Sequence, residues 1–96
     1  MKVRFTRGAL AQLAAIRSDL TAKNPAAAQA FETRIRQVSM RISQFPHSFQ
    51  AVAQRPGVRR APLLRYPFLV FYKVVAEEAI IVRIIHGARR EPWENL

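Results

Sequence analysis

The sequence RYPFLVFYKVVAEEAIIVRIIHGARR, residues 65–90, decides the fold of this chain. It contains two runs of apolar, β-branched and aromatic residues, 68–75 and 79–85, and only the short acidic segment 76–78 separates them. Residues of these types are enriched in strands, and so short a connection between two strands forms an antiparallel hairpin. The stretch is therefore expected to be the central hairpin of a β-sheet.

Alternate residues of this hairpin are expected to point to opposite faces of the sheet. In the first strand the two sets are Phe68, Val70, Tyr72 and Val74, and Leu69, Phe71 and Lys73. In the second strand they are Ile80, Val82, Ile84 and His86, and Ile81, Arg83 and Ile85. Both faces are largely apolar, so both need a cover, either from the rest of the chain or from a partner.

Length and composition limit the class of protein. The 96 residues suit a single domain, 1–96, and the 50% hydrophobic content with three Gly favours a folded core over disorder. The absence of Cys excludes disulfides, thiolate metal ligands and thiol catalysis. No apolar run approaches the ~20 residues of a membrane span, and the N-terminal residues lack the apolar core of a signal peptide. A cytoplasmic protein without membrane contact is expected.

Charge is the most unusual feature of the composition. Sixteen Lys and Arg against six Asp and Glu give a formal net charge of +10. Such an excess favours an anionic partner, which is either a nucleic acid or an acidic protein. Thirteen of the cations are Arg, whose planar guanidinium makes bidentate contacts with phosphate and carboxylate groups. The alternative is a solvated basic surface that serves solubility alone.

Two amphipathic helices are expected before the hairpin, over residues 7 to about 23 and 25–45, after a short strand at 2–5. Apolar residues recur at helical spacing in both helices. They are Leu10, Leu13, Ile16 and Leu20 in the first, and Phe31, Ile35, Val38, Ile42 and Phe45 in the second. Asn24 and Pro25 mark the boundary, because Asn favours the N-cap and Pro the first helical position. So short a link predicts an antiparallel helical hairpin.

The remaining segments are a loop at 47–57 and an edge strand at 58–63, in which Pro62 is tolerated because an edge residue need not donate a hydrogen bond. The fold class is therefore α+β, with an N-terminal strand and an α-helical hairpin on one face of a small, mainly antiparallel sheet. Two helices cannot cover both faces. The other face is expected to stay open, to be lined with Arg, and to carry the function.

The candidate functional residues are cations and one His at the strands and their ends: Arg59, Arg60, Arg65, Arg83, His86, Arg89 and Arg90. Cations that hold a phosphate, with a His that transfers a proton near neutral pH, could promote attack of an RNA 2′-hydroxyl on its own phosphodiester without a metal. The alternative is that Arg89 and Arg90 form a solvated strand end and that His86 is a packed imidazole. The carboxylates are scattered, so no metal site and no cofactor is expected.

The segments RYPFLVFYKV and AIIVRIIHGARR, joined by an acidic turn, resemble the C-terminal half of the ParE/RelE superfamily of bacterial toxins, specifically its ParE or plasmid-stabilisation branch. The similarity extends over the N-terminal strand and the helical hairpin, and so over nearly the whole chain. It implies a toxin of a type II toxin–antitoxin system, neutralised by a cognate antitoxin that wraps an acidic segment over it. It also implies an antitoxin with a DNA-binding domain, ParD-like or similar, through which the complex binds operator DNA.

The resemblance implies two possible targets. ParE-like members poison DNA gyrase, whereas RelE-like members are ribosome-dependent, metal-independent mRNA endonucleases that use Lys, Arg or Glu with a Tyr or His near the C-terminus. Residues 47–64 contain no Lys and no Glu, and no Tyr follows Arg90. A gyrase poison without catalytic residues is therefore favoured, and a toxin fold that only co-represses its operon is a third possibility.

The two possible targets imply different roles for the candidate residues. For a gyrase poison, the surface that binds the target or the antitoxin contains Arg59, Arg60, Arg65, Arg83, His86, Arg89, Arg90 and Trp93. For a ribonuclease acting on mRNA at the ribosome, the resemblance implies that Arg65 and Arg83 hold the phosphate and that His86 is the acid or base, with Arg89 nearby.

Overall fold

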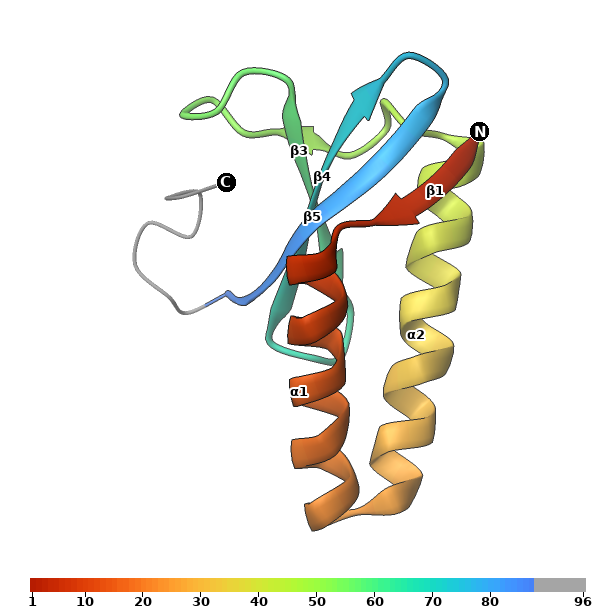
Figure 1. Cartoon of the computed structure of the whole chain (residues 1–96), viewed down its shortest axis with the longest axis vertical. Helices are drawn as coiled ribbons and strands as arrows, with labels where there is room; N and C mark the ends of the chain where they lie inside the picture. Colours follow the sequence, from red (N-terminus) through yellow and green to blue (C-terminus); the bar gives the residue numbers. More distant parts are fainter. Residues whose placement is uncertain (88–96) are drawn as a thin grey trace.

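The computed structural model describes residues 1–87, which form a five-stranded sheet with two antiparallel helices on one face (Figure 1). The elements are β1 (Lys2–Phe5), α1 (Arg7–Lys23), α2 (Pro25–Gln44), β2 (Gln50–Ala51), β3 (Val58–Leu63), β4 (Phe68–Val75) and β5 (Glu78–His86). The strand order is β1-β5-β4-β3-β2, with β1 parallel to β5 and the other neighbours antiparallel. The expected α+β fold is confirmed.

Two side chains define the ends of the helices. The Thr6 hydroxyl accepts a hydrogen bond from the backbone N–H of Ala9 (3.1 Å) and caps α1. Asn24 ends α1 by donating its N–H to the carbonyl of Leu20 (2.7 Å), and its side chain caps α2 by accepting from the N–H of Ala26 (3.0 Å). One residue thus separates the helices, and this tight connection makes them antiparallel. Within residues 1–87, no helix is long and apolar enough to cross a membrane.

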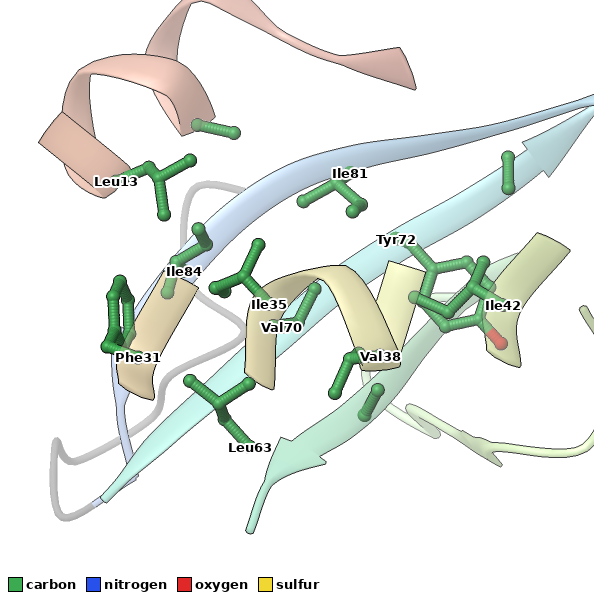
Figure 2. Packing of buried hydrophobic residues seen from close by; sticks show 13 residues of the cluster. Leu13, Phe31, Ile35, Val38, Ile42, Leu63, Val70, Tyr72, Ile81 and Ile84 are labelled. Atoms are coloured by element: carbon green, nitrogen blue, oxygen red, sulfur yellow. The ribbon is translucent and has the colours of Figure 1, made fainter. Parts of the chain in front are cut away.

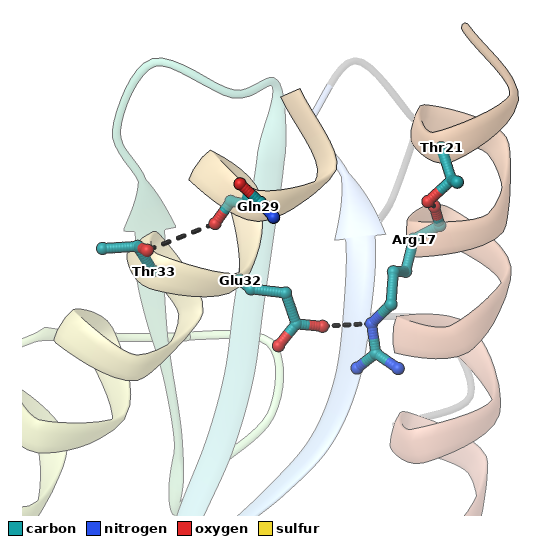
Figure 3. A network of polar contacts seen from close by, with 5 residues as sticks. All are labelled: Arg17, Thr21, Gln29, Glu32 and Thr33. Atoms are coloured by element: carbon teal, nitrogen blue, oxygen red, sulfur yellow. Dashed lines mark hydrogen bonds and ion pairs between the residues drawn. The ribbon is translucent and has the colours of Figure 1, made fainter. Parts of the chain in front are cut away.

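An ion pair joins the outer surfaces of the two helices (Figure 3). The Nε of Arg17 in α1 contacts a carboxylate oxygen of Glu32 in α2, and Figure 3 shows the two side chains reaching across the gap between the helices. Two hydroxyls on the same helices, Thr21 and Thr33, bond to carbonyls of their own helix. Because the Arg17 side chain is 45% exposed, this pair contributes little to stability. Apolar packing is what holds the helices to the sheet.

The main core lies between the helices and the sheet, and Figure 2 shows side chains from both layers meeting there. Its largest members include Phe31 and Tyr72, which are both fully buried. The ring of Phe31 packs edge-on against Tyr66 (centroids 5.5 Å apart) and Phe68 (6.1 Å). The other members labelled in Figure 2 are Leu13, Ile35, Val38, Ile42, Leu63, Val70, Ile81 and Ile84.

Two residues of the expected apolar stripes do not join this core. Leu10 is 51% exposed, and Ala9 is fully buried in its place, one turn before Leu13. The small side chain of Ala9 lets the start of α1 approach the sheet closely. Phe45 is 53% exposed because α2 ends at Gln44 and Phe45 is the C-cap, whose backbone has left the helical conformation. The guanidinium of Arg41 lies 5.5 Å from the centre of the Phe45 ring.

The hairpin of β4 and β5 contains a β-bulge that strict alternation does not predict. The pairs on its two sides are Phe71 with Arg83 and Tyr72 with Ile81. Val82 is therefore an extra residue in β5, and the faces of the strand change places there. As a result Ile81 and Ile84 both lie in the core beneath the helices, whereas regular alternation would separate them.

The start of α1 satisfies the backbone of β5 beside this bulge. β1 ends at its pairing with Ile81, and the N–H of Thr6 still donates to the Ile81 carbonyl (2.9 Å). The Thr6 hydroxyl then donates to the carbonyl of Val82 (3.3 Å), and the side-chain oxygen of Gln12 accepts from the N–H of Ile84 (2.8 Å). The side chains of Thr6 and Gln12 thus continue the hydrogen bonding that β1 begins along the edge of β5.

The expectation that 58–63 forms the edge strand is wrong. The two-residue strand β2 lies outside β3 and pairs with it at Arg59 and Arg60. The strand β2 has only two residues, too few for an apolar pattern that would predict it. Pro62 lies just past the end of β2, so on that side, within the described chain, no strand requires a backbone N–H from it.

Candidate functional site

The face of the sheet opposite the helices is here called the open face. It has a small apolar centre, separate from the main core, in which Phe71 is the largest fully buried side chain. The loop that joins β2 to β3 contributes Val52 to this centre. The other members are Val58 and Ile85, with Leu69 and Val82 packed against them. Part of the apolar surface of β4 and β5 is therefore covered by a loop rather than by a helix.

Cations surround this apolar centre. Arg60 of β3 and Arg83 of β5 are the neighbours of Phe71 on its two sides in the sheet, so one row across the open face runs Arg60, Phe71, Arg83. Lys73 lies two residues along β4 and is exposed on the same face. At the far edge, Arg4 of β1 forms an ion pair with Glu78 (3.1 Å). The open face therefore carries a guanidinium group on either side of a fully buried aromatic ring.

Arg60 is positioned by the short strand β2. Its Nε and Nη2 atoms both donate to the side-chain oxygen of Gln50, at 3.2 and 2.9 Å. A hollow of about 210 Å³ lies beside this contact, between Arg60, Phe71 and the loop that follows β2. The strand pair thus holds the guanidinium at the border of the open face.

Arg59 points to the opposite side and has a structural contact. Its Nη1 donates to the carbonyls of Phe49 (2.7 Å) and His47 (3.2 Å), which ties the loop after α2 to β3. The nearby hydroxyl of Tyr72 donates to the carbonyl of Pro46 (2.6 Å). Burial raises the pKa of Tyr72 above its usual value of 10.0, and the charge of Arg59 opposes part of that rise.

His86 and Arg65 lie away from the row of Arg60 and Arg83. His86 is at the end of β5, and its ring stacks edge-on against Phe68 (5.6 Å), which packs against the core beneath the helices. Because Arg83 pairs with a residue of the open face, Arg83 and His86 leave β5 on opposite faces. Arg65 is exposed in the turn between β3 and β4, with a left-handed φ of 74°.

The structure thus brings together two of the expected residues, Arg60 and Arg83, and places Arg59, Arg65 and His86 elsewhere. The remaining three, Arg89, Arg90 and Trp93, lie outside the described residues. In the described part of the chain, no group of three or more His, Cys, Asp or Glu is placed to hold a metal ion. The open face is suited to bind a partner with anionic and apolar groups.

Comparison with known proteins identifies the family. The model of a family described as the ParE toxin of the type II toxin-antitoxin system parDE matches residues 3–91. This chain belongs to the ParE toxin family. A solved chain of the "Chromosomal ParDE TA system from P. aeruginosa" is similar to it, with a TM-score of 0.78 and 28% identity over 90% of this chain and 95% of that chain. No curated protein matches the sequence.

The expected resemblance and toxin class are therefore confirmed, and this ParE-family toxin has a cognate antitoxin as its partner. The candidate functional residues did not include Lys73 and Arg4, which also lie on the open face of the toxin. Both alternate with apolar residues in their strands, as Arg83 does. Strand alternation was the signal that could have found them.

Proposed function

We propose that this ParE-family toxin poisons DNA gyrase through contacts of the open face. The placement of Arg60 and Arg83 on either side of the buried Phe71 is the observation that carries the proposal. Arg side chains are enriched at protein interfaces and among the few residues that supply most of the binding energy. Gyrase bound to DNA offers carboxylate and phosphate groups that these two guanidinium groups would engage. Membership of the ParE family supports gyrase as the target.

The alternative is a ribosome-dependent mRNA endonuclease of the RelE type. That reaction requires cations that hold the phosphate and an acid or base close to the same phosphate. Arg83 and His86 leave β5 on opposite faces, and Arg65 lies in a turn at the end of the sheet. This separation supports a mechanism by contacts over one by acid–base chemistry.

The proposal is tested by mixing the purified toxin with gyrase, supercoiled plasmid and ATP, then quenching with detergent and protease. Linear plasmid that accumulates with toxin dose, and that the antitoxin prevents, is the expected result, since a poison traps the enzyme in its DNA-cleaved state. Unchanged supercoiling without linear product would overturn the proposal for that gyrase.

A second assay separates the two mechanisms. The toxin is added to translating ribosomes, and cleavage of the mRNA is followed by primer extension. His86→Gln should leave gyrase poisoning within about twofold, because a contact-only mechanism requires no proton transfer from this side chain. Cleavage of mRNA that falls by orders of magnitude in His86→Gln would establish the endonuclease instead.

The remaining partner assignments follow from the same function. We infer that the toxin acts in the cytoplasm, where gyrase and the chromosome are, and that its antitoxin carries a ParD-like or similar DNA-binding domain. The complex would then bind operator DNA through the antitoxin. Gel-shift titration of the upstream DNA should show retardation by the complex and by the antitoxin, and none by the toxin alone at physiological salt.

A further inference from the structure

The apolar centre of the open face is closed to a partner, whereas the cations around it are accessible. The buried members of the centre, each at most 9% exposed, are Val52, Val58, Phe71 and Ile85. The side chain of Lys73 is exposed on the same face, and Arg60 and Arg83 are half-buried beside the centre. The centre of this face therefore offers a partner mainly positive charge.

The positive charge continues to the far edge of the sheet. Arg4 of β1 and Lys73 of β4 both pair with Ile80 in the strand between them, so their side chains leave the sheet on one face. Among residues 1–87, Glu78 is the carboxylate that the strands place on this face, and Arg4 is paired with it. Against this one carboxylate the described strands place five cations, Lys2, Arg4, Arg60, Lys73 and Arg83.

A surface of this kind fits the phosphate backbone of DNA better than a protein surface. Interfaces between proteins place apolar and aromatic groups at their centre, and on the open face those groups are buried inside the toxin. Interfaces with DNA are more polar and much more positively charged. Contacts of Lys and Arg with phosphate need no particular base sequence, so cations at irregular spacing on a sheet can make them.

The open face is suited to duplex DNA rather than to a single strand. Proteins that bind single strands stack the bases on exposed aromatic side chains. Phe71 is the aromatic residue that the described strands place on this face, and it is fully buried. The hollow of about 210 Å³ beside it is lined by Arg60, Gln50 and Gln54. Guanidinium and amide N–H groups donate to phosphate oxygens, so this hollow suits a phosphate of the backbone.

We infer that the open face binds the phosphate backbone of duplex DNA, and that Arg60 and Lys73 make two of the contacts. The toxin then touches the DNA held by gyrase, and it binds the complex of gyrase with DNA more tightly than gyrase alone. This last step rests on the proposed function, whereas the contact with DNA does not. Contacts with phosphate alone are weak at physiological salt and strengthen as the salt concentration falls.

The test titrates full-length toxin into a short fluorescent DNA duplex and follows the anisotropy between about 50 and about 200 mM salt. Lys73→Gln and Arg60→Gln should each make the slope of log K against log salt concentration less negative by about 0.9, since each removes one phosphate contact. The matched controls, Lys23→Gln and Arg36→Gln, remove the same charge from exposed positions on the helices and should leave the slope unchanged. Circular dichroism melting checks each fold, and Lys73→Gln decides the question if Arg60→Gln does not fold.

Slopes in the open-face variants that match those of the controls would overturn the inference, because binding would then reflect net charge alone. Tighter binding of a single-stranded RNA than of the duplex would also overturn it, as expected of an endonuclease. In a second titration, the wild type should bind gyrase loaded with DNA at least about fivefold more tightly than free gyrase, and equal affinities would overturn the step at gyrase. If the wild type does not poison gyrase, the proposed function fails, while the duplex titration still decides the contact with DNA.

Discussion

The two faces of the same sheet differ in what their side chains do. Beneath the helices, β4 and β5 contribute to a core whose thirteen buried members include Tyr72 and Ile84. On the open face the same strands contribute to a centre of four buried residues, bordered by Arg60, Lys73 and Arg83. Under the proposed function, stability and partner binding depend on alternate residues of one hairpin. Substitutions on one face should change the free energy of unfolding, and on the other the binding of partners.

Phe31→Ala should have the largest effect and is the strongest test of the helix side. Phe31 is fully buried against Tyr66 and Phe68, and removing so large a buried ring costs about 3–5 kcal/mol. Urea unfolding followed by circular dichroism measures this loss. Lys73→Gln on the open face is the matched comparison and should change stability by less than about 0.5 kcal/mol. Equal losses in the two variants would remove the distinction between the faces.

Gln12→Leu should have the next largest effect, a loss of about 1–3 kcal/mol in the free energy of unfolding. The variant keeps the volume of the side chain but leaves the N–H of Ile84, beside the bulge, without the acceptor that Gln12 supplies at 2.8 Å. Chemical denaturation provides the free energy, and Gln29→Leu, at an exposed position of α2, is the control. A loss no greater than in the control would mean that α1 does not depend on this bond to hold the edge of β5.

Arg83→Gln tests the open face. If Arg83 contacts the target, the toxin dose that gives half-maximal DNA cleavage by gyrase should rise about tenfold, which corresponds to about 1.4 kcal/mol. The midpoint of thermal unfolding should change far less than in Phe31→Ala. Lys23→Gln removes an exposed cation at the end of α1 and should leave the dose unchanged. A variant that unfolds easily but poisons gyrase normally would assign Arg83 to stability instead.

Tyr72→Phe should cost about 1 kcal/mol near neutral pH, since it removes the bond to the Pro46 carbonyl. The pH dependence has a definite sign. The pKa of Tyr72 is raised in the folded state. The protonated hydroxyl therefore contributes fully to the free energy of unfolding below the unfolded pKa of about 10, and this contribution is lost as pH rises above that value. Between pH 8 and 11, the free energy of unfolding should therefore fall less steeply with pH in Tyr72→Phe than in the wild type. Parallel curves for the two proteins would contradict this account.

Local pattern predicted most of the fold. The bounds of both helices and of the central hairpin follow from apolar spacing and from Asn24, because these signals act within a few residues. The bulge at Val82 was not predicted, since strict alternation assumes a regular ladder. The exposure of Leu10 and Phe45 was also missed, because it depends on how closely α1 approaches the sheet and on where α2 ends.

The site was predictable only in part. Charge and alternation indicated cations on an open face, and Arg60 and Arg83 are found there. Arg83 and His86 are three residues apart in one strand, so alternation already places them on opposite faces. Grouping them in one catalytic set therefore conflicted with strand alternation. The hollow between α2 and β3 could not be predicted, because its lining residues Arg41 and Leu64 are distant in sequence and line one hollow only when α2 packs beside β3.

Ala76→Gly should have the smallest effect on the free energy of unfolding, and it should stabilise the fold rather than destabilise it. The pair of Val75 and Glu78 closes a two-residue turn in which Ala76 has a φ of 53°, a conformation that Gly adopts without the steric cost paid by a Cβ. The gain in unfolding free energy should be about 0.5 kcal/mol.

Gly57→Ala is the reverse control for this change. Gly57 has a φ of 85°, and no atom of the described chain lies within 4 Å of an added Cβ, so a loss of about 1 kcal/mol there would reflect backbone conformation alone. Neither Ala76 nor Gly57 contributes a side chain to the buried residues of either face, so antitoxin affinity and gyrase poisoning should stay unchanged in either variant. A turn substitution that altered partner binding as well as stability would show that the open face depends on the turns for its geometry, and the two faces could no longer be treated as separable.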